Sequence, residues 1–158
     1  MGDTHALAAQ LAGRIRPGDV VLLIGELGAG KTAFTKGLGA ALGVSEDITS
    51  PTFTIMRDYP VVVPGHGPTT FLHLDAYRLD GPEAAEDIGL LELLDDGAFA
   101  VVEWGDVVSA AFGHDPLAIE LVWESDDERT VVFSASDEGP WVERLSEWFE
   151  PSEAGAST

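Results

Sequence analysis

The order of apolar and polar positions along the chain predicts alternating helices and strands. Val20 to Ile24 is a short apolar run between turn residues, which is typical of a strand buried on both faces. Apolar residues also recur at helical spacing from Leu7 to Ile15 and from Phe34 to Leu42. The sequence therefore begins with a helix, a buried strand and a second helix.

The middle of the chain predicts a hairpin. Phe53 to Val63 and Phe71 to Leu74 have the pattern of strands, and the Pro64–Pro68 loop between them is too short for a crossover helix. The remaining predicted elements are a helix from Gly81 to Leu94, strands at 98–102, 119–123 and 130–135, and a helix from Trp141 to Trp148. We therefore expect an α/β fold whose central sheet is mixed but mostly parallel.

A glycine-rich motif separates the first strand from the second helix. Residues 25–32 read Gly-Glu-Leu-Gly-Ala-Gly-Lys-Thr and satisfy the P-loop pattern G-x-x-x-x-G-K-[ST] in the strand–loop–helix context that it requires. Small residues let backbone N–H groups point at phosphates, the lysine bridges the β- and γ-phosphates, and the threonine hydroxyl ligates magnesium. The predicted contacts are Gly25, Gly28, Ala29, Gly30, Lys31 and Thr32. The fold is thus expected to be a P-loop NTPase-like three-layer α/β/α sandwich, with the Lys31 side chain facing solvent.

Two acidic residues are candidates for the carboxylate that serves the metal of a P-loop protein. Asp75 and Glu103 each follow an apolar strand, where such a carboxylate is normally found. An acidic residue at a strand end is also common on protein surfaces, so the spacing leaves both interpretations open.

The segment Ser50–Thr54, with the sequence Ser-Pro-Thr-Phe-Thr, lies between the second helix and the hairpin. A switch segment that senses a γ-phosphate lies in this part of many P-loop proteins. The segment could equally be the entry to a strand that happens to contain a proline.

The charge of the chain limits its partners. Of 158 residues, 8 are Lys or Arg and 28 are Asp or Glu, which gives a net charge of −20. From Glu103 onward the only basic residues are Arg129 and Arg144. Nucleic-acid binding depends on basic side chains that neutralise phosphates, so we expect poor binding of tRNA or DNA by this chain alone.

Other classes of protein are disfavoured by what the sequence lacks. There are no cysteines, which excludes disulfides and thiol chemistry. No apolar run reaches the ~18 residues of a membrane helix, so we expect a cytoplasmic protein with no membrane association. Residues 1–150 are expected to form a single domain and residues 151–158 a disordered tail.

Four motifs in order resemble the bacterial TsaE (YjeE) family. They are the P-loop at 25–32, the Ser50–Thr54 segment, His73-Leu74-Asp75-Ala76-Tyr77-Arg78, and Val102-Glu103-Trp104. The resemblance runs from about Leu7 to Trp104. From Val107 onward, the predicted strands and helix are supported by hydrophobic periodicity alone.

The resemblance implies an ATPase of tRNA threonylcarbamoyladenosine (t6A) synthesis, which acts on position 37 of tRNA with the TsaB and TsaD proteins. ATP and Mg²⁺ are the implied cofactors, and tRNA would be reached only through the complex. Carried over by residue, Lys31 would hold the phosphates, Thr32 and Glu103 would serve magnesium, and Asp75 would be a second catalytic carboxylate near the γ-phosphate. Thr52 and Thr54 would line the switch segment, and Trp104 would pack beside the site.

One position departs from the family, since a second Thr or Ser often follows the P-loop threonine and this chain has Ala33. The backbone N–H of Ala33 can still contact the α-phosphate. The four histidines lack metal-binding spacing and are interpreted as structural or solvent-facing. Tyr77 and Arg78 could serve a protein contact.

Two other functions remain possible from the residues. A small-molecule kinase would need a lid and basic residues for its acceptor, and neither is clear in the sequence. A slow nucleotide-dependent assembly switch would use the same P-loop without rapid turnover.

Overall fold

The computed structural model describes residues 2–26, 30–46, 48, 56–77, 79–113, 115–126 and 128–149. The α-helices are α1 (Gly2–Ala12), α2 (Lys31–Ala41), α3 (Glu83–Asp87), α4 (Leu90–Asp95) and α5 (Val142–Trp148), and two 3₁₀ helices are η1 (Gly105–Val107) and η2 (Ser109–Phe112). The strands are β1 (Val20–Ile24), β2 (Met56–Val63), β3 (Gly67–Asp75), β4 (Phe99–Glu103), β5 (Leu117–Ser125) and β6 (Glu128–Ala135).

The strands form one six-stranded sheet in the order β2-β3-β4-β1-β5-β6. The four central strands, β3, β4, β1 and β5, run parallel to one another. The two edge strands are antiparallel to their neighbours: β2 forms a hairpin with β3, and β6 forms a hairpin with β5. The expected mixed, mostly parallel sheet with a hairpin is therefore confirmed.

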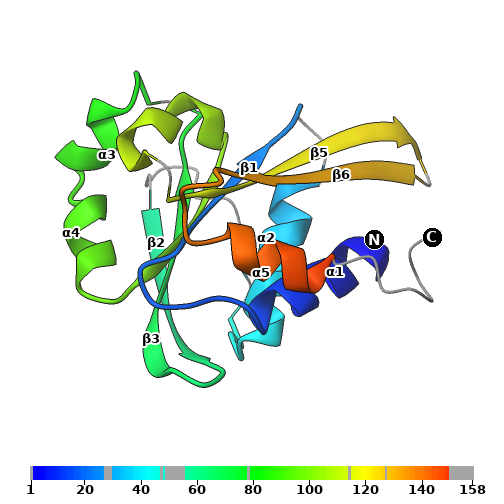
Figure 1. The fold of residues 1–158 in the computed structure, drawn as a ribbon, viewed down its shortest axis with the longest axis horizontal. Helices are drawn as coiled ribbons and strands as arrows, with labels where there is room; N and C mark the ends of the chain where they lie inside the picture. The colour runs from blue at the N-terminus through cyan, green and yellow to red at the C-terminus, as the bar shows by residue number, and fades with distance from the viewer. Residues whose placement is uncertain are drawn as a thin grey trace.

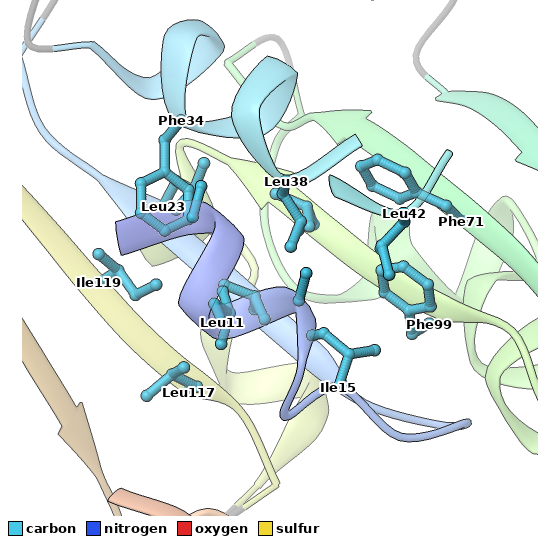
Figure 2. Close-up of a cluster of buried hydrophobic side chains, with 14 of the residues drawn as sticks. Leu11, Ile15, Leu23, Phe34, Leu38, Leu42, Phe71, Phe99, Leu117 and Ile119 are labelled. Atoms are coloured by element: carbon cyan, nitrogen blue, oxygen red, sulfur yellow. The ribbon is translucent and has the colours of Figure 1, made fainter. Parts of the chain in front are cut away.

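Helices cover both faces of the sheet, as Figure 1 shows. One core lies between the sheet and α1, α2 and α5, and it includes Leu11, Phe34 and Trp141. Figure 2 shows side chains of α2, among them Phe34 and Leu38, directed toward α1 and the sheet. The second core packs α3, α4 and both 3₁₀ helices on the other face. This arrangement confirms the three layers.

Strand β1 belongs to both cores. Its side chains alternate, so that Val21 and Leu23 lie in the core under α2 while Val20 and Leu22 lie in the core under α4. A strand with helices on both faces has no polar side, which explains its continuous apolar sequence. The buried strand predicted at Val20 to Ile24 is confirmed with its expected bounds.

Two expected helices differ in detail. The helix expected from Gly81 is broken into α3 and α4 at Gly89, whose φ of 80° is in the left-handed region. Helix α1 ends at Ala12, so Ile15 lies beyond it although its side chain is buried. In both cases the apolar spacing was correct for burial but did not mark where the helix ends.

The parallel strands place the carboxyl ends of β3, β4 and β1 at one edge of the sheet. Asp75 is paired in register with Glu103, and Glu103 with Leu23, next to the end of β1. Ligands of open α/β sheets bind at such an edge.

Candidate functional site

The structure brings the described P-loop residues and both candidate acids to the same edge of the sheet. Gly25 follows β1, and the first turn of α2 holds Lys31, Thr32 and Ala33. Of the other predicted residues, Asp75 ends β3 and Glu103 ends β4. The predicted positions Gly28, Ala29, Thr52, Thr54 and Arg78 lie outside the described residues.

Helix α2 begins with its backbone donors directed at this edge. Gly30 precedes the helix with a φ of 108°, a left-handed conformation that favours glycine, and no side-chain hydrogen bond caps the helix within the described part of the chain. The first N–H groups of a helix have no partners inside the helix and attract anions. The N-terminal end of α2 is therefore chemically suited to bind phosphate.

Lys31 is buried rather than facing solvent, contrary to expectation, with 5% of its surface exposed. Its ammonium nitrogen donates hydrogen bonds to the carbonyl oxygens of Gly25 at 2.7 Å and Glu26 at 3.0 Å. The Trp104 ring covers the same nitrogen at 4.1 Å from the ring centre. The aliphatic stem packs at the start of α2, and the charge is held by backbone oxygens and an aromatic face.

The ionisation of Lys31 reflects this environment. Burial lowers the pKa of the amine from its ordinary value of 10.5, and the carboxylates of Glu103, Asp75, Glu26 and Asp106 act in the opposite direction. Desolvation is the larger effect. The Lys31 ammonium group therefore lies in the field of four carboxylates.

Thr32 and Glu103 are hydrogen bonded although they are far apart in sequence. The Thr32 hydroxyl donates to Oε1 of Glu103 at 3.0 Å and lies 3.3 Å from Oε2. Glu103 is 3% exposed, so its carboxylate is almost withdrawn from solvent. A hydroxyl and a carboxylate in contact form the oxygen-rich environment that Mg²⁺ prefers.

His73 provides a second contact to Glu103 that the sequence analysis did not connect with the site. Its Nε2 lies 2.5 Å from Oε2 of Glu103, and its side chain is fully buried. The available signal was its position two residues before Asp75 in the same strand, since side chains two apart lie on one face. Its contact with Glu103 required the pairing of β3 with β4.

Asp75 lies beside Glu103 but in a different environment. It is partly exposed, and its Oδ1 accepts a hydrogen bond from the Tyr77 N–H at 3.0 Å. Of the two predicted acidic residues, Glu103 is therefore buried, while water can reach Asp75.

Trp104 forms a wall of the site. Its φ of 59° makes it the one residue other than glycine with a positive φ in the described ranges. The chain turns there directly after β4, and Gly105 packs against Leu22 of β1. The exposed Tyr77 ring lies 4.9 Å from the Trp104 ring.

Within the described ranges, no group of three or more His, Cys, Asp or Glu side chains is placed to hold a metal ion. A protein-only metal cage is therefore not found there. Mg²⁺ commonly binds through one or two protein oxygens together with phosphates and water, and Thr32 with Glu103 fits that pattern. The described helices include none that is long and apolar enough to cross a membrane.

Comparison with known proteins agrees with this geometry. The family model "Threonylcarbamoyl adenosine biosynthesis protein TsaE" matches residues 1–131. A Bacillus subtilis relative described as a tRNA threonylcarbamoyladenosine biosynthesis protein TsaE is 38% identical over 133 residues, which cover 84% of this chain and 80% of the relative. A Treponema pallidum relative of the same description is 38% identical over 130 residues, covering 82% and 92%.

A solved structure extends the similarity to the fold. The crystal structure of Bacillus subtilis YdiB aligns with a TM-score of 0.72 and 33% identity, covering 93% of this chain and 86% of that one. The resemblance inferred from four short motifs is therefore confirmed over most of the chain. By sequence and by fold, this chain belongs to the TsaE family of threonylcarbamoyl adenosine biosynthesis proteins.

Proposed function

We propose that this chain binds and hydrolyses ATP as a P-loop ATPase of the t6A modification machinery. The observation that carries the proposal is the contact between the Thr32 hydroxyl and Glu103, 71 residues apart in sequence. It joins the P-loop threonine to a strand-end carboxylate, the pair that holds magnesium in P-loop enzymes. An ordinary glycine-rich surface turn with an exposed lysine would not be expected to place its threonine hydroxyl on a buried strand-end carboxylate.

Phosphate binding is assigned to the loop and the first turn of α2. Lys31 would exchange the carbonyl oxygens of Gly25 and Glu26 for phosphate oxygens, and its charge would neutralise the triphosphate. The N–H groups of Gly30, Lys31, Thr32 and Ala33 would supply further donors, together with Gly25, Gly28 and Ala29 of the loop.

Magnesium would be held by Thr32 and Glu103. When bound, the ion supplies charge that stabilises the phosphate oxygens during transfer. The buried Glu103 carboxylate keeps an oxygen directed at the Thr32 hydroxyl, so the protein's part of the site is formed before nucleotide arrives. We assign Asp75, which water can reach, to orient the attacking water.

The reaction is expected to be slow without partners. Lys31 is engaged by protein groups, and activation requires that these contacts be exchanged. We infer that TsaD and TsaB are the partners and that Thr52 and the neighbouring switch segment respond to nucleotide. The strong negative charge of the chain supports contact with tRNA only through that complex. We place this function in the cytoplasm.

The test is ATP turnover of the purified chain with and without TsaB and TsaD, in Mg²⁺ and in EDTA. We expect slow magnesium-dependent release of phosphate that the partners accelerate. Phosphate transfer to a small acceptor would instead indicate a kinase. Nucleotide-dependent assembly with no turnover would indicate a switch.

A gel shift at moderate salt tests the route to tRNA. We expect no shift of tRNA by this chain alone and a nucleotide-dependent shift when TsaB and TsaD are present. Tight binding of tRNA by the chain alone would contradict the argument from charge.

A further inference from the structure

His73 is a buried titratable side chain that the proposed function does not use. It lies on β3 with no exposed surface, on the face that α2 covers. A histidine has two ring nitrogens, and buried polar atoms usually have hydrogen-bond partners. Here one nitrogen contacts Glu103 and the other has no hydrogen-bond partner among the described residues.

The unequal environments of the two nitrogens indicate where the proton resides. Nδ1 is buried and unpartnered, while Nε2 is 2.5 Å from a carboxylate oxygen. An ionised carboxylate only accepts hydrogen bonds, so the nitrogen that contacts it must be the donor. Nε2 therefore carries hydrogen and donates it to Oε2 of Glu103.

Both side-chain oxygens of Glu103 and its backbone carbonyl oxygen accept hydrogen bonds. Oε2 accepts from His73, Oε1 accepts from Thr32, and the backbone carbonyl accepts from the Ala76 N–H at 2.9 Å. A glutamate side chain has several rotatable bonds, and ordering it costs rotamer entropy. The two side-chain donors offset that cost before any ligand binds.

We propose that His73 is a positioning residue that holds Oε2 of Glu103 so that Oε1 stays directed at Thr32, where magnesium would bind. This inference rests on the proposed function, because it assigns Glu103 to the metal. His73 itself touches neither nucleotide nor metal in this proposal. Its effect is on the orientation of the carboxylate, and it should appear in magnesium-dependent binding more than in nucleotide binding as such.

The test compares His73→Leu, which removes the donor, with His73→Gln, whose amide nitrogen can occupy the position of Nε2. Leu72→Val, on the same strand but in the opposite core, controls for a general loss of packing. For each full-length variant, the affinity for a fluorescent ADP analogue is measured in Mg²⁺ and in EDTA, with thermal unfolding alongside.

We expect His73→Leu to need about 10–100-fold more Mg²⁺ for tight nucleotide binding, with affinity in EDTA unchanged. His73→Gln should recover most of the magnesium response, and Leu72→Val should keep all of it. A wild-type magnesium response in His73→Leu would overturn the proposal, as would equal losses in His73→Leu and Leu72→Val. If the wild-type protein binds no nucleotide in either condition, the proposed function is wrong, and this outcome differs from each result that would contradict the role of His73.

A second measurement covers the case in which His73→Leu does not fold. The ¹⁵N spectrum of histidine-labelled wild-type protein reports which ring nitrogens carry hydrogen, and His73 is assigned by the signal missing from His73→Gln. We expect a protonated Nε2. An Nε2 without hydrogen would overturn the proposal, because that nitrogen could not donate to Glu103.

Discussion

The ammonium nitrogen of Lys31 lies 4.1 Å from the centre of the Trp104 ring. This nitrogen is the group that the P-loop motif assigns to phosphates. The same nitrogen donates to two backbone carbonyl oxygens, so one cation joins the loop after β1 to the residue after β4. The side chain that the P-loop motif assigns to phosphates is therefore also the one that packs against Trp104.

Lys31→Ala should lose nucleotide binding and retain its fold. The substitution removes the ammonium group that would bind the phosphates, and a charged hydrogen bond is worth about 1.5–3 kcal/mol, so nucleotide affinity should fall at least ~100-fold. A loss of stability of about 1–3 kcal/mol is expected because Lys31 is buried. Circular dichroism, urea unfolding and titration with a fluorescent nucleotide measure these effects. The control is Lys36→Ala on the exposed side of α2, and unchanged nucleotide affinity in Lys31→Ala would contradict the P-loop assignment.

The stability contributed by Lys31 should depend on pH. Burial lowers its pKa in the folded state below the 10.5 of the unfolded chain, so the unfolded state binds more protons between these two values. The free energy of unfolding of the wild type relative to Lys31→Met should therefore rise with pH through that window and level off above 10.5. Urea unfolding at several alkaline pH values gives the comparison. Parallel curves for the two proteins would show that the amine is not desolvated.

Glu103→Gln and Asp75→Asn should separate binding from hydrolysis. Both replacements keep the shape of the side chain and remove the charge, and neither residue is assigned to grip the phosphates. We expect nucleotide to bind within a few-fold of the wild type while turnover falls about 100-fold or more. Only Glu103→Gln should also raise the Mg²⁺ requirement. Normal turnover in both variants would place the catalytic carboxylate elsewhere.

Gly105→Ala should destabilise the protein far more than Gly39→Ala. A Cβ at Gly105 would lie 2.5 Å from Cβ and 2.9 Å from Cα of Leu22, a strand residue that cannot move aside. At Gly39 the close contact is Cδ1 of Ile48, the end of a side chain that can rotate, and alanine favours the helix by about 0.5–1 kcal/mol. Urea unfolding should show a loss of about 1–3 kcal/mol at Gly105 and a change within about 1 kcal/mol at Gly39. Equal losses would contradict the contact with β1.

Arg144→Met should destabilise the fold without changing the site. Arg144 forms a buried bidentate ion pair with Asp19, at 2.7 and 3.0 Å, and joins α5 to the start of β1. Removing one partner leaves a buried charge unpaired and should cost about 3–5 kcal/mol. Adding Asp19→Asn should restore part of the loss in a double-mutant cycle. Nucleotide affinity of the folded variant should equal that of the wild type, and a loss of affinity would indicate that α5 supports the site.

Local sequence alone determined the P-loop and most of the secondary structure. The apolar run at Val20 to Ile24 and the glycines and lysine after it require only neighbouring residues, because strand burial and loop chemistry are encoded at short range. The family resemblance also followed from local motifs. The same spacing could not place the break at Gly89, since periodic burial continues across it.

The tertiary structure decided which side chains meet. Only the pairing of β3 with β4, and the packing of α2 over them, brings His73 and Thr32 to the two oxygens of Glu103. It also buried Lys31 and set the Trp104 ring over its ammonium nitrogen, whereas the family resemblance had placed Trp104 only beside the site. Such contacts join residues about 30 to 70 positions apart, and they depend on strand order and register, which no short stretch of sequence contains.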